Sequence, residues 1–114
     1  MMPCSVPEIT VQQLAVQLQQ EPRPFLLDVR QPNEHQYARL EGSHLVPLHT
    51  LRSQLADLRE RIPEGTPIVV YCHHGVRSLI AAQALMQAGF SKVSSLAGGI
   101  EAWSVEIDPS VPRY

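Results

Sequence analysis

The residue best suited to chemistry is Cys72, one of two cysteines in the chain. It follows a short apolar run, residues 67–71, and precedes a stretch with helical spacing that begins at Arg77. A thiol between a buried strand and a helix meets converging backbone N–H groups and the positive end of the helix dipole. Both effects favour the thiolate, which is the nucleophilic form of cysteine. We therefore predict that Cys72 is a nucleophile.

The loop after Cys72 is short and contains a glycine. Six residues run from Cys72 to Arg77, in the pattern Cys-x4-Arg, with Gly75 inside. A loop curled around one sulfur atom needs inward-pointing N–H groups, and glycine accepts the positive φ that such a nest requires. Arg77 adds a charge that is not lost by deprotonation. The residues predicted to surround the sulfur are His73, His74, Gly75, Val76, Arg77 and Ser78.

Two charged residues, Asp28 and Arg30, follow another apolar run and could support charge near the site. The favoured interpretation is structural, because carboxylates away from water usually have a fixed partner. We expect an ion pair in which Arg30 reaches Glu34.

The adjacent histidines, His73 and His74, invite a metal interpretation. Neighbouring residues lack the spacing that lets ligands converge on zinc, so no metal is predicted. We expect these histidines to shape the mouth of the site and to supply partial positive charge below about pH 6.5. Cys4 lies in an N-terminal segment, residues 1–6, that is expected to be frayed, and it is interpreted as a spectator.

The composition is typical of one small globular domain. The chain has 114 residues, 44% hydrophobic and 18% charged, with a net charge of −2. It has no basic stripe for nucleic acid, no apolar run long enough for a membrane and no secretion signal. We therefore predict a single domain over residues 1–114, with 107–114 as an extended tail. A cytoplasmic location and free thiols in a reducing compartment are expected, without nucleic-acid or membrane partners.

Strand and helix patterns alternate along the chain. A helix is expected after Thr10, which has Gln13 in the position of a capping box. The alternation predicts an α/β fold: a mostly parallel central sheet of about five strands with helices on both faces. Ligands bind such sheets beyond the carboxyl ends of the strands, where Cys72 lies. The predicted strands are residues 25–29, 44–46, 68–71 and 92–96, and the predicted helices are 11–18, 32–40, 51–62, 77–88 and a short one after 99.

Three motifs resemble those of the rhodanese family. The first is the segment that starts at Cys72, which is similar to the family's active-site loop. Residues 27–30 with Glu34 resemble its Asp-Val-Arg-x-x-x-Glu signature, and residues 96–100 with Trp103 resemble its Gly-Gly-x-x-x-Trp signature. The likeness spans nearly the whole chain.

The resemblance implies a rhodanese-like fold and a thiosulfate sulfurtransferase that needs no cofactor. Cys72 would take a sulfane sulfur from a small anionic donor, thiosulfate or a persulfide, and carry it as a persulfide. The acceptor would be cyanide in an assay and a thiol in the cell, such as glutathione or a thioredoxin-like protein. The physiological donor and acceptor, the pathway, the oligomeric state and any participation of Cys4 stay open.

Two other functions are weighed against sulfur transfer. Cysteine phosphatases and arsenate reductases on related folds use Cys-x5-Arg, a loop one residue longer that accommodates a tetrahedral oxyanion. Here the sixth residue after Cys72 is Ser78, so sulfur transfer is favoured. A rhodanese-like module that only binds a partner is the other alternative, because a fold does not guarantee a function. Inactive relatives generally lack the cysteine, which this chain has.

Overall fold

The computed structural model describes residues 6–114, so Cys4 and most of the segment expected to be frayed lie outside the described residues. Five parallel strands form one sheet in the order β1-β5-β4-β2-β3. This confirms the predicted fold class. The strands are β1 (Glu8–Ile9), β2 (Phe25–Asp28), β3 (His44–Leu45), β4 (Ile68–Tyr71) and β5 (Val93–Leu96).

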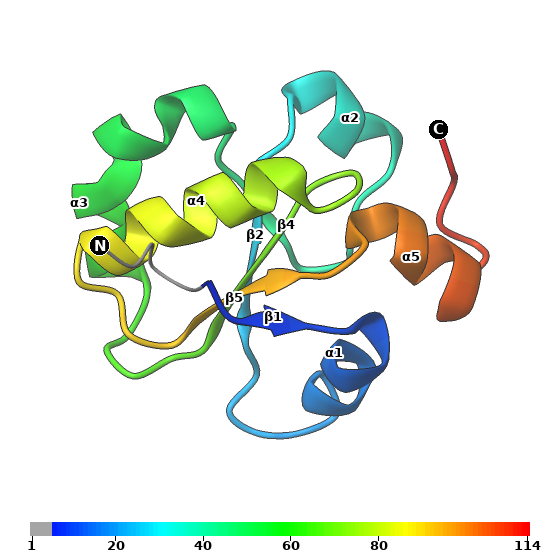
Figure 1. Cartoon of the computed structure of the whole chain (residues 1–114), viewed down its shortest axis with the longest axis horizontal. Helices are drawn as coiled ribbons and strands as arrows, with labels where there is room; N and C mark the ends of the chain where they lie inside the picture. The colour runs from blue at the N-terminus through cyan, green and yellow to red at the C-terminus, as the bar shows by residue number, and fades with distance from the viewer. Residues whose placement is uncertain (1–5) are drawn as a thin grey trace.

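Helices cover both faces of the sheet (Figure 1). One apolar cluster lies under α3 and α4, and a second lies under α1 and α5. The helices are α1 (Val11–Gln17), α2 (Pro32–Tyr37), α3 (Leu51–Arg61), α4 (Val76–Gln87) and α5 (Gly99–Glu106), with a short 3-10 turn η1 (Leu48–Thr50) before α3.

The central strand β4 determines the direction in which Cys72 points. All four of its residues are buried, as expected for a parallel strand covered on both faces. Side chains alternate along a strand, so Val70 and Cys72 join the cluster under α3 and α4, whereas Val69 and Tyr71 join the other cluster. The thiol therefore leaves the carboxyl end of β4 on the side of α4.

The predicted elements agree with the structure to within a few residues. Thr10 caps α1 with the expected capping box. Helix α2 ends at Tyr37, earlier than the predicted Leu40, and α4 begins at Val76, one residue before Arg77. Strand β1 was not predicted, because two residues are too few to display a periodicity.

Two further features concern the molecule as a whole. Within residues 6–114, none of the helices has the length and apolar character needed to traverse a lipid bilayer. After α5 the chain turns at Asp108, whose carbonyl accepts from the N–H of Val111 at 3.1 Å. It then runs past α5 toward α2, as the red segment in Figure 1 shows.

Candidate active site

The Cys72 sulfur is enclosed by its own loop. Cys72 is only 1% exposed. The backbone N–H of Gly75 donates to its Sγ at 3.1 Å, and that of Ser78 donates at 3.4 Å. Gly75 has a φ of +116° and is the N-cap of α4. This left-handed conformation turns the loop so that a backbone donor from the loop and one from the first helical turn meet at one atom.

Two buried serine hydroxyl groups link the Cys72 sulfur to strand β5. Ser78 Oγ lies 3.5 Å from Cys72 Sγ and 2.7 Å from Oγ of Ser95 in β5. Both serines are fully buried. Ser95 was missed in the sequence, although a polar residue in a buried strand between Val93 and Leu96 is a signal that could have indicated it.

The start of α5 holds the loop from the other side. The N–H groups of Ile100 and Glu101 donate to the carbonyl oxygens of Cys72 and His73, at 2.9 and 3.1 Å. A Cβ on Gly99 would lie 2.4 Å from the His73 oxygen and 2.5 Å from the Cys72 oxygen. Gly98 and Gly99, both with a positive φ, lie between β5 and the first turn of α5. This glycine pair allows two backbone segments to approach each other at the site.

Arg77 is held by an acidic residue at the rim of the loop. Its Nη1 and Nη2 donate to the two carboxylate oxygens of Glu34 at 2.7 and 3.0 Å. The hydrogen bonds from Arg77, together with one from the N–H of Gln31, lower the pKa of Glu34 to about 2 despite partial burial. Glu34 is therefore ionised at neutral pH and offsets the positive charge of Arg77.

Asp28 and Arg30 form a buried ion pair beside the site, with both side chains 0% exposed. Arg30 Nε and Nη2 donate to the Asp28 carboxylate at 2.9 and 2.8 Å. The same carboxylate contacts His35 Nδ1 at 2.7 Å and accepts from the Tyr71 hydroxyl at 3.2 Å. Burial opposes the charge of the guanidinium, but the hydrogen bonds to Asp28 and Tyr114 prevail and raise the pKa of Arg30 above its usual value.

The expected ion pair between Arg30 and Glu34 is wrong. Arg30 bonds to Asp28, and Glu34 bonds to Arg77. Asp28 and Arg30 are two residues apart at the end of an extended strand, so their side chains leave on the same side and meet. The partner of Arg30 is Asp28, the charged residue that lies nearest to it in the fold, and not Glu34 on the next helix.

An aromatic stack covers the next residue of the loop. The His73 ring lies 3.9 Å from the Tyr114 ring, at 10° between planes, and 4.0 Å from the His74 ring. Burial and the neighbouring His74 lower the pKa of His73 below its usual 6.5. His73 therefore becomes charged only at a lower pH than the sequence suggested. Tyr114 was missed, since nothing in the sequence indicates that this segment returns to the loop.

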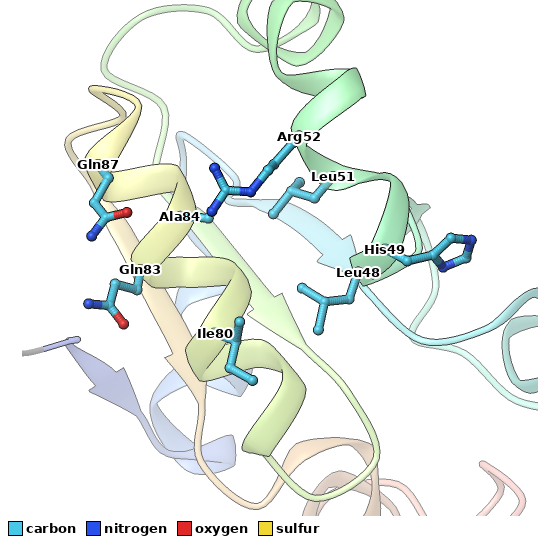
Figure 2. Close-up of a pocket in the computed structure, with 8 residues that line it drawn as sticks. All are labelled: Leu48, His49, Leu51, Arg52, Ile80, Gln83, Ala84 and Gln87. Carbon is cyan, nitrogen blue, oxygen red and sulfur yellow. The ribbon is translucent and has the colours of Figure 1, made fainter.

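The surface outside the loop holds a groove, and no cluster of metal ligands is found among residues 6–114. Among residues 6–114, no group of three or more His, Cys, Asp or Glu side chains is arranged to hold a metal ion. A groove of about 440 Å³ separates the start of α3 from the outer side of α4 (Figure 2). It contains no cysteine and no residue of the loop. Its lining residues are Leu48, His49, Leu51, Arg52, Ile80, Gln83, Ala84 and Gln87.

Known proteins resemble this chain over most of its length. The family model of the rhodanese-like domain matches residues 10–106. The chain is 37% identical over 89 residues to the chloroplastic rhodanese-like/PpiC domain-containing protein 12 of Arabidopsis thaliana, covering 78% of this chain and 30% of that protein. It is 37% identical over 93 residues to the adenylyltransferase and sulfurtransferase MOCS3-2 of Zea mays, covering 79% and 19%.

A solved structure agrees with these sequence comparisons. The fold matches a rhodanese-related protein of Thermoplasma volcanium with a TM-score of 0.77 and 27% identity, over 95% of this chain and 99% of that one. The chain spans less than a third of the length of the two plant proteins. Family model, sequence relatives and fold lead to the same conclusion: this chain belongs to the family of rhodanese-like domains.

Proposed function

We propose that this protein is a sulfurtransferase that carries a sulfane sulfur as a persulfide on Cys72. The observation that carries the proposal is the pair of backbone donors, from Gly75 and Ser78, directed at Sγ inside a six-residue loop. Donors aimed in advance at an atom that bears negative charge stabilise the charged states of a reaction without reorganisation. A sulfur nucleophile in such a cradle is suited to covalent catalysis.

In the first step, with thiosulfate as donor, the Cys72 thiolate attacks the outer sulfur of thiosulfate. The new S–S bond forms as the old one breaks, and sulfite leaves with the electron pair. In the second step an acceptor attacks the outer sulfur of the persulfide, and Cys72 leaves as a thiolate. Cyanide yields thiocyanate, and a thiolate acceptor yields a new persulfide. Covalent capture divides one difficult transfer into two easier ones.

The proposal also names the chemical classes of the sulfur donor and the sulfur acceptor. The donor is a small anionic sulfur compound, thiosulfate or a persulfide, and the cellular acceptor is a thiol such as glutathione or a thioredoxin-like protein. Glu34 offsets the charge of Arg77, so Arg77 attracts the donor less than a free guanidinium would. We propose that the other loop residues, His73, His74 and Val76, line the approach to the sulfur. A reducing compartment such as the cytoplasm suits a free catalytic thiol.

Two cysteine variants test this proposal in the purified full chain. Cys72→Ser should abolish the cyanide-dependent consumption of thiosulfate, because the persulfide has no sulfur on which to form. Cys4→Ser is the matched control and should retain nearly the whole rate. Equal loss in both variants would mean that Cys4 takes part in the transfer. An unchanged rate in Cys72→Ser would refute the role proposed for Cys72, whereas a wild-type protein that consumes no thiosulfate would favour a binding module.

A further inference from the structure

The segment after α5 returns to the active-site loop and places Tyr114 on it. The Tyr114 ring stacks on His73, the residue next to Cys72, at 3.9 Å and 10°. The Tyr37 ring, at the end of α2, meets the Tyr114 ring edge to face, with 6.0 Å between ring centres and 80° between planes. Figure 1 shows this segment running from α5 toward α2. One side of the approach to the loop is therefore built from residues distant in sequence.

The Tyr114 hydroxyl is fixed between two charged groups. It accepts from Arg30 Nη1 at 2.7 Å and donates to Glu34 Oε2 at 2.8 Å. Arg30 is itself immobilised by Asp28, and Glu34 holds Arg77. Hydrogen bonds to charged groups are the stronger kind in proteins. Partial burial of the hydroxyl is the main cause that raises the pKa of Tyr114 to about 12, although the residue as a whole is 43% exposed, so the hydroxyl keeps its proton at neutral pH and can donate to Glu34.

Two further contacts tie the same segment to α5. Arg113 donates to the Glu101 carboxylate from Nε and Nη2, at 3.0 and 2.6 Å. The Ser104 hydroxyl donates to the carbonyl oxygen of Val111 at 2.9 Å. Three points along residues 111–114 are thus attached to the body of the domain. These contacts hold the segment against α5 and the neighbouring loop.

The covering of His73 is incomplete in one respect. Its Nε2 is buried, and among residues 6–114 it has no hydrogen-bond partner. A buried polar atom without a partner costs free energy. The hydrogen bonds of Tyr114 to Arg30 and Glu34 offset this cost.

We propose that Tyr114 is a specificity-determining residue. Its side chain forms one wall of the approach to Cys72. This wall lets small reagents reach the sulfur and slows the reaction of bulky thiols. The acceptor part of this inference rests on the proposed sulfur transfer, whereas the restriction on access to Cys72 does not.

The first test measures access to Cys72 without any sulfur chemistry. The full chain, carrying Cys4→Ser so that one thiol reacts, is alkylated with iodoacetamide or with fluorescein maleimide, and modification of Cys72 is followed by mass spectrometry. Tyr114→Ala should raise the rate with the bulky maleimide about five- to tenfold relative to iodoacetamide, as expected for removal of a barrier of about 1 kcal/mol. Tyr114→Phe keeps the stacking but loses both hydrogen bonds, and should give an intermediate ratio.

Val105→Ala, on the exposed side of α5, is the matched control and should leave the ratio unchanged. A Tyr114→Ala protein whose two alkylation rates rise equally, or do not change, would overturn the inference. Such a result would mean that the segment stabilises the loop or only lies over it.

The second test compares two sulfur acceptors. Tyr114→Ala should raise kcat/KM for glutathione relative to kcat/KM for cyanide by a similar factor, whereas general damage to the loop would lower both together. An unchanged ratio would refute the acceptor part of the inference. A wild-type protein that transfers no sulfur to either acceptor would refute the proposed function, and the alkylation ratio would still decide whether Tyr114 restricts access.

Discussion

Charged side chains beside Cys72 form one connected series. Asp28 bonds to Arg30, Arg30 to the Tyr114 hydroxyl, that hydroxyl to Glu34, and Glu34 to Arg77. Negative and positive groups alternate, so each charge near the loop has a partner of opposite sign. The electrostatic consequence is that the sulfur is stabilised by the amide donors of the loop more than by a free cation.

The members of this series could be identified in the sequence, but their pairing could not be predicted in full. Asp28 and Arg30 are two residues apart, and the period of a strand would have been enough to predict that they meet. Glu34 and Arg77 are separated by 43 residues, and their contact depends on how α2 and α4 are placed. Tyr114 carries no local signal at all.

The ion pair at Glu34 predicts a specific dependence of stability on pH. The pKa of Glu34 is lowered from 4.5 to about 2 in the folded protein. Its contribution is therefore fully present above pH 4.5 and is lost progressively as the pH falls from 4.5 to about 2. Because the Arg77 side chain is 33% exposed, we expect solvent screening to limit this contribution to about 1–2 kcal/mol.

Urea denaturation at about pH 6 and about pH 3 measures this contribution. Wild type should lose more unfolding free energy on acidification than Glu34→Gln, which has no carboxylate to protonate. Glu60→Gln, at an exposed position of α3, is the control and should follow wild type. Parallel pH profiles for wild type and Glu34→Gln would contradict the role assigned to this pair.

At the scale of elements, the loop is positioned by the helices on either side of it. Helix α4 supplies the amide of Ser78, and the start of α5 binds the carbonyl oxygens of Cys72 and His73. The strand–loop–helix order around Cys72 was predicted from hydrophobic runs and spacing. The contact with α5 was not, because a glycine pair predicts a turn but does not indicate which segment packs against it.

Substitution of Gly99 should disrupt the loop more than the fold of α5. A Cβ at this position would lie 2.4 Å from the His73 oxygen, and the residue has a φ of +60°. We expect Gly99→Ala to lower sulfur transfer at least about tenfold and to cost about 3 kcal/mol, since backbone must move as well as adopt a strained conformation.

Gly65→Ala is the matched control for this prediction. Gly65 also has a positive φ, +88°, but in the described part of the chain no atom lies within 4 Å of the position of its Cβ. It should cost about 1 kcal/mol and leave activity unchanged, because only the conformational strain remains. Activity assays and urea denaturation of Gly99→Ala and Gly65→Ala separate the effect of the close backbone contact from the effect of the strained φ alone. Equal effects in both would mean that the close approach to the loop is unimportant.

At the scale of the whole molecule, the sheet brings the separate motifs to one edge. The carboxyl ends of β2, β4 and β5 are neighbours in the strand order, so Asp28, Cys72 and the glycine pair after Leu96 come together there. The alternation of strands and helices was sufficient to predict the fold class and this edge. The strand order, the short outer strand β1 and the return of residues 108–114 depend on long-range packing, which local patterns do not contain.

The proposed sulfur transfer depends on one intermediate, the persulfide of Cys72. Mass spectrometry of the intact protein after incubation with thiosulfate, with and without a reducing agent, measures it directly. We predict an added mass of one sulfur atom, located at Cys72, removed by the reductant and absent from Cys72→Ser. The proposed sulfur transfer would be contradicted if wild-type protein stayed unmodified with both thiosulfate and a polysulfide donor. It would also be contradicted if the adduct persisted in Cys72→Ser.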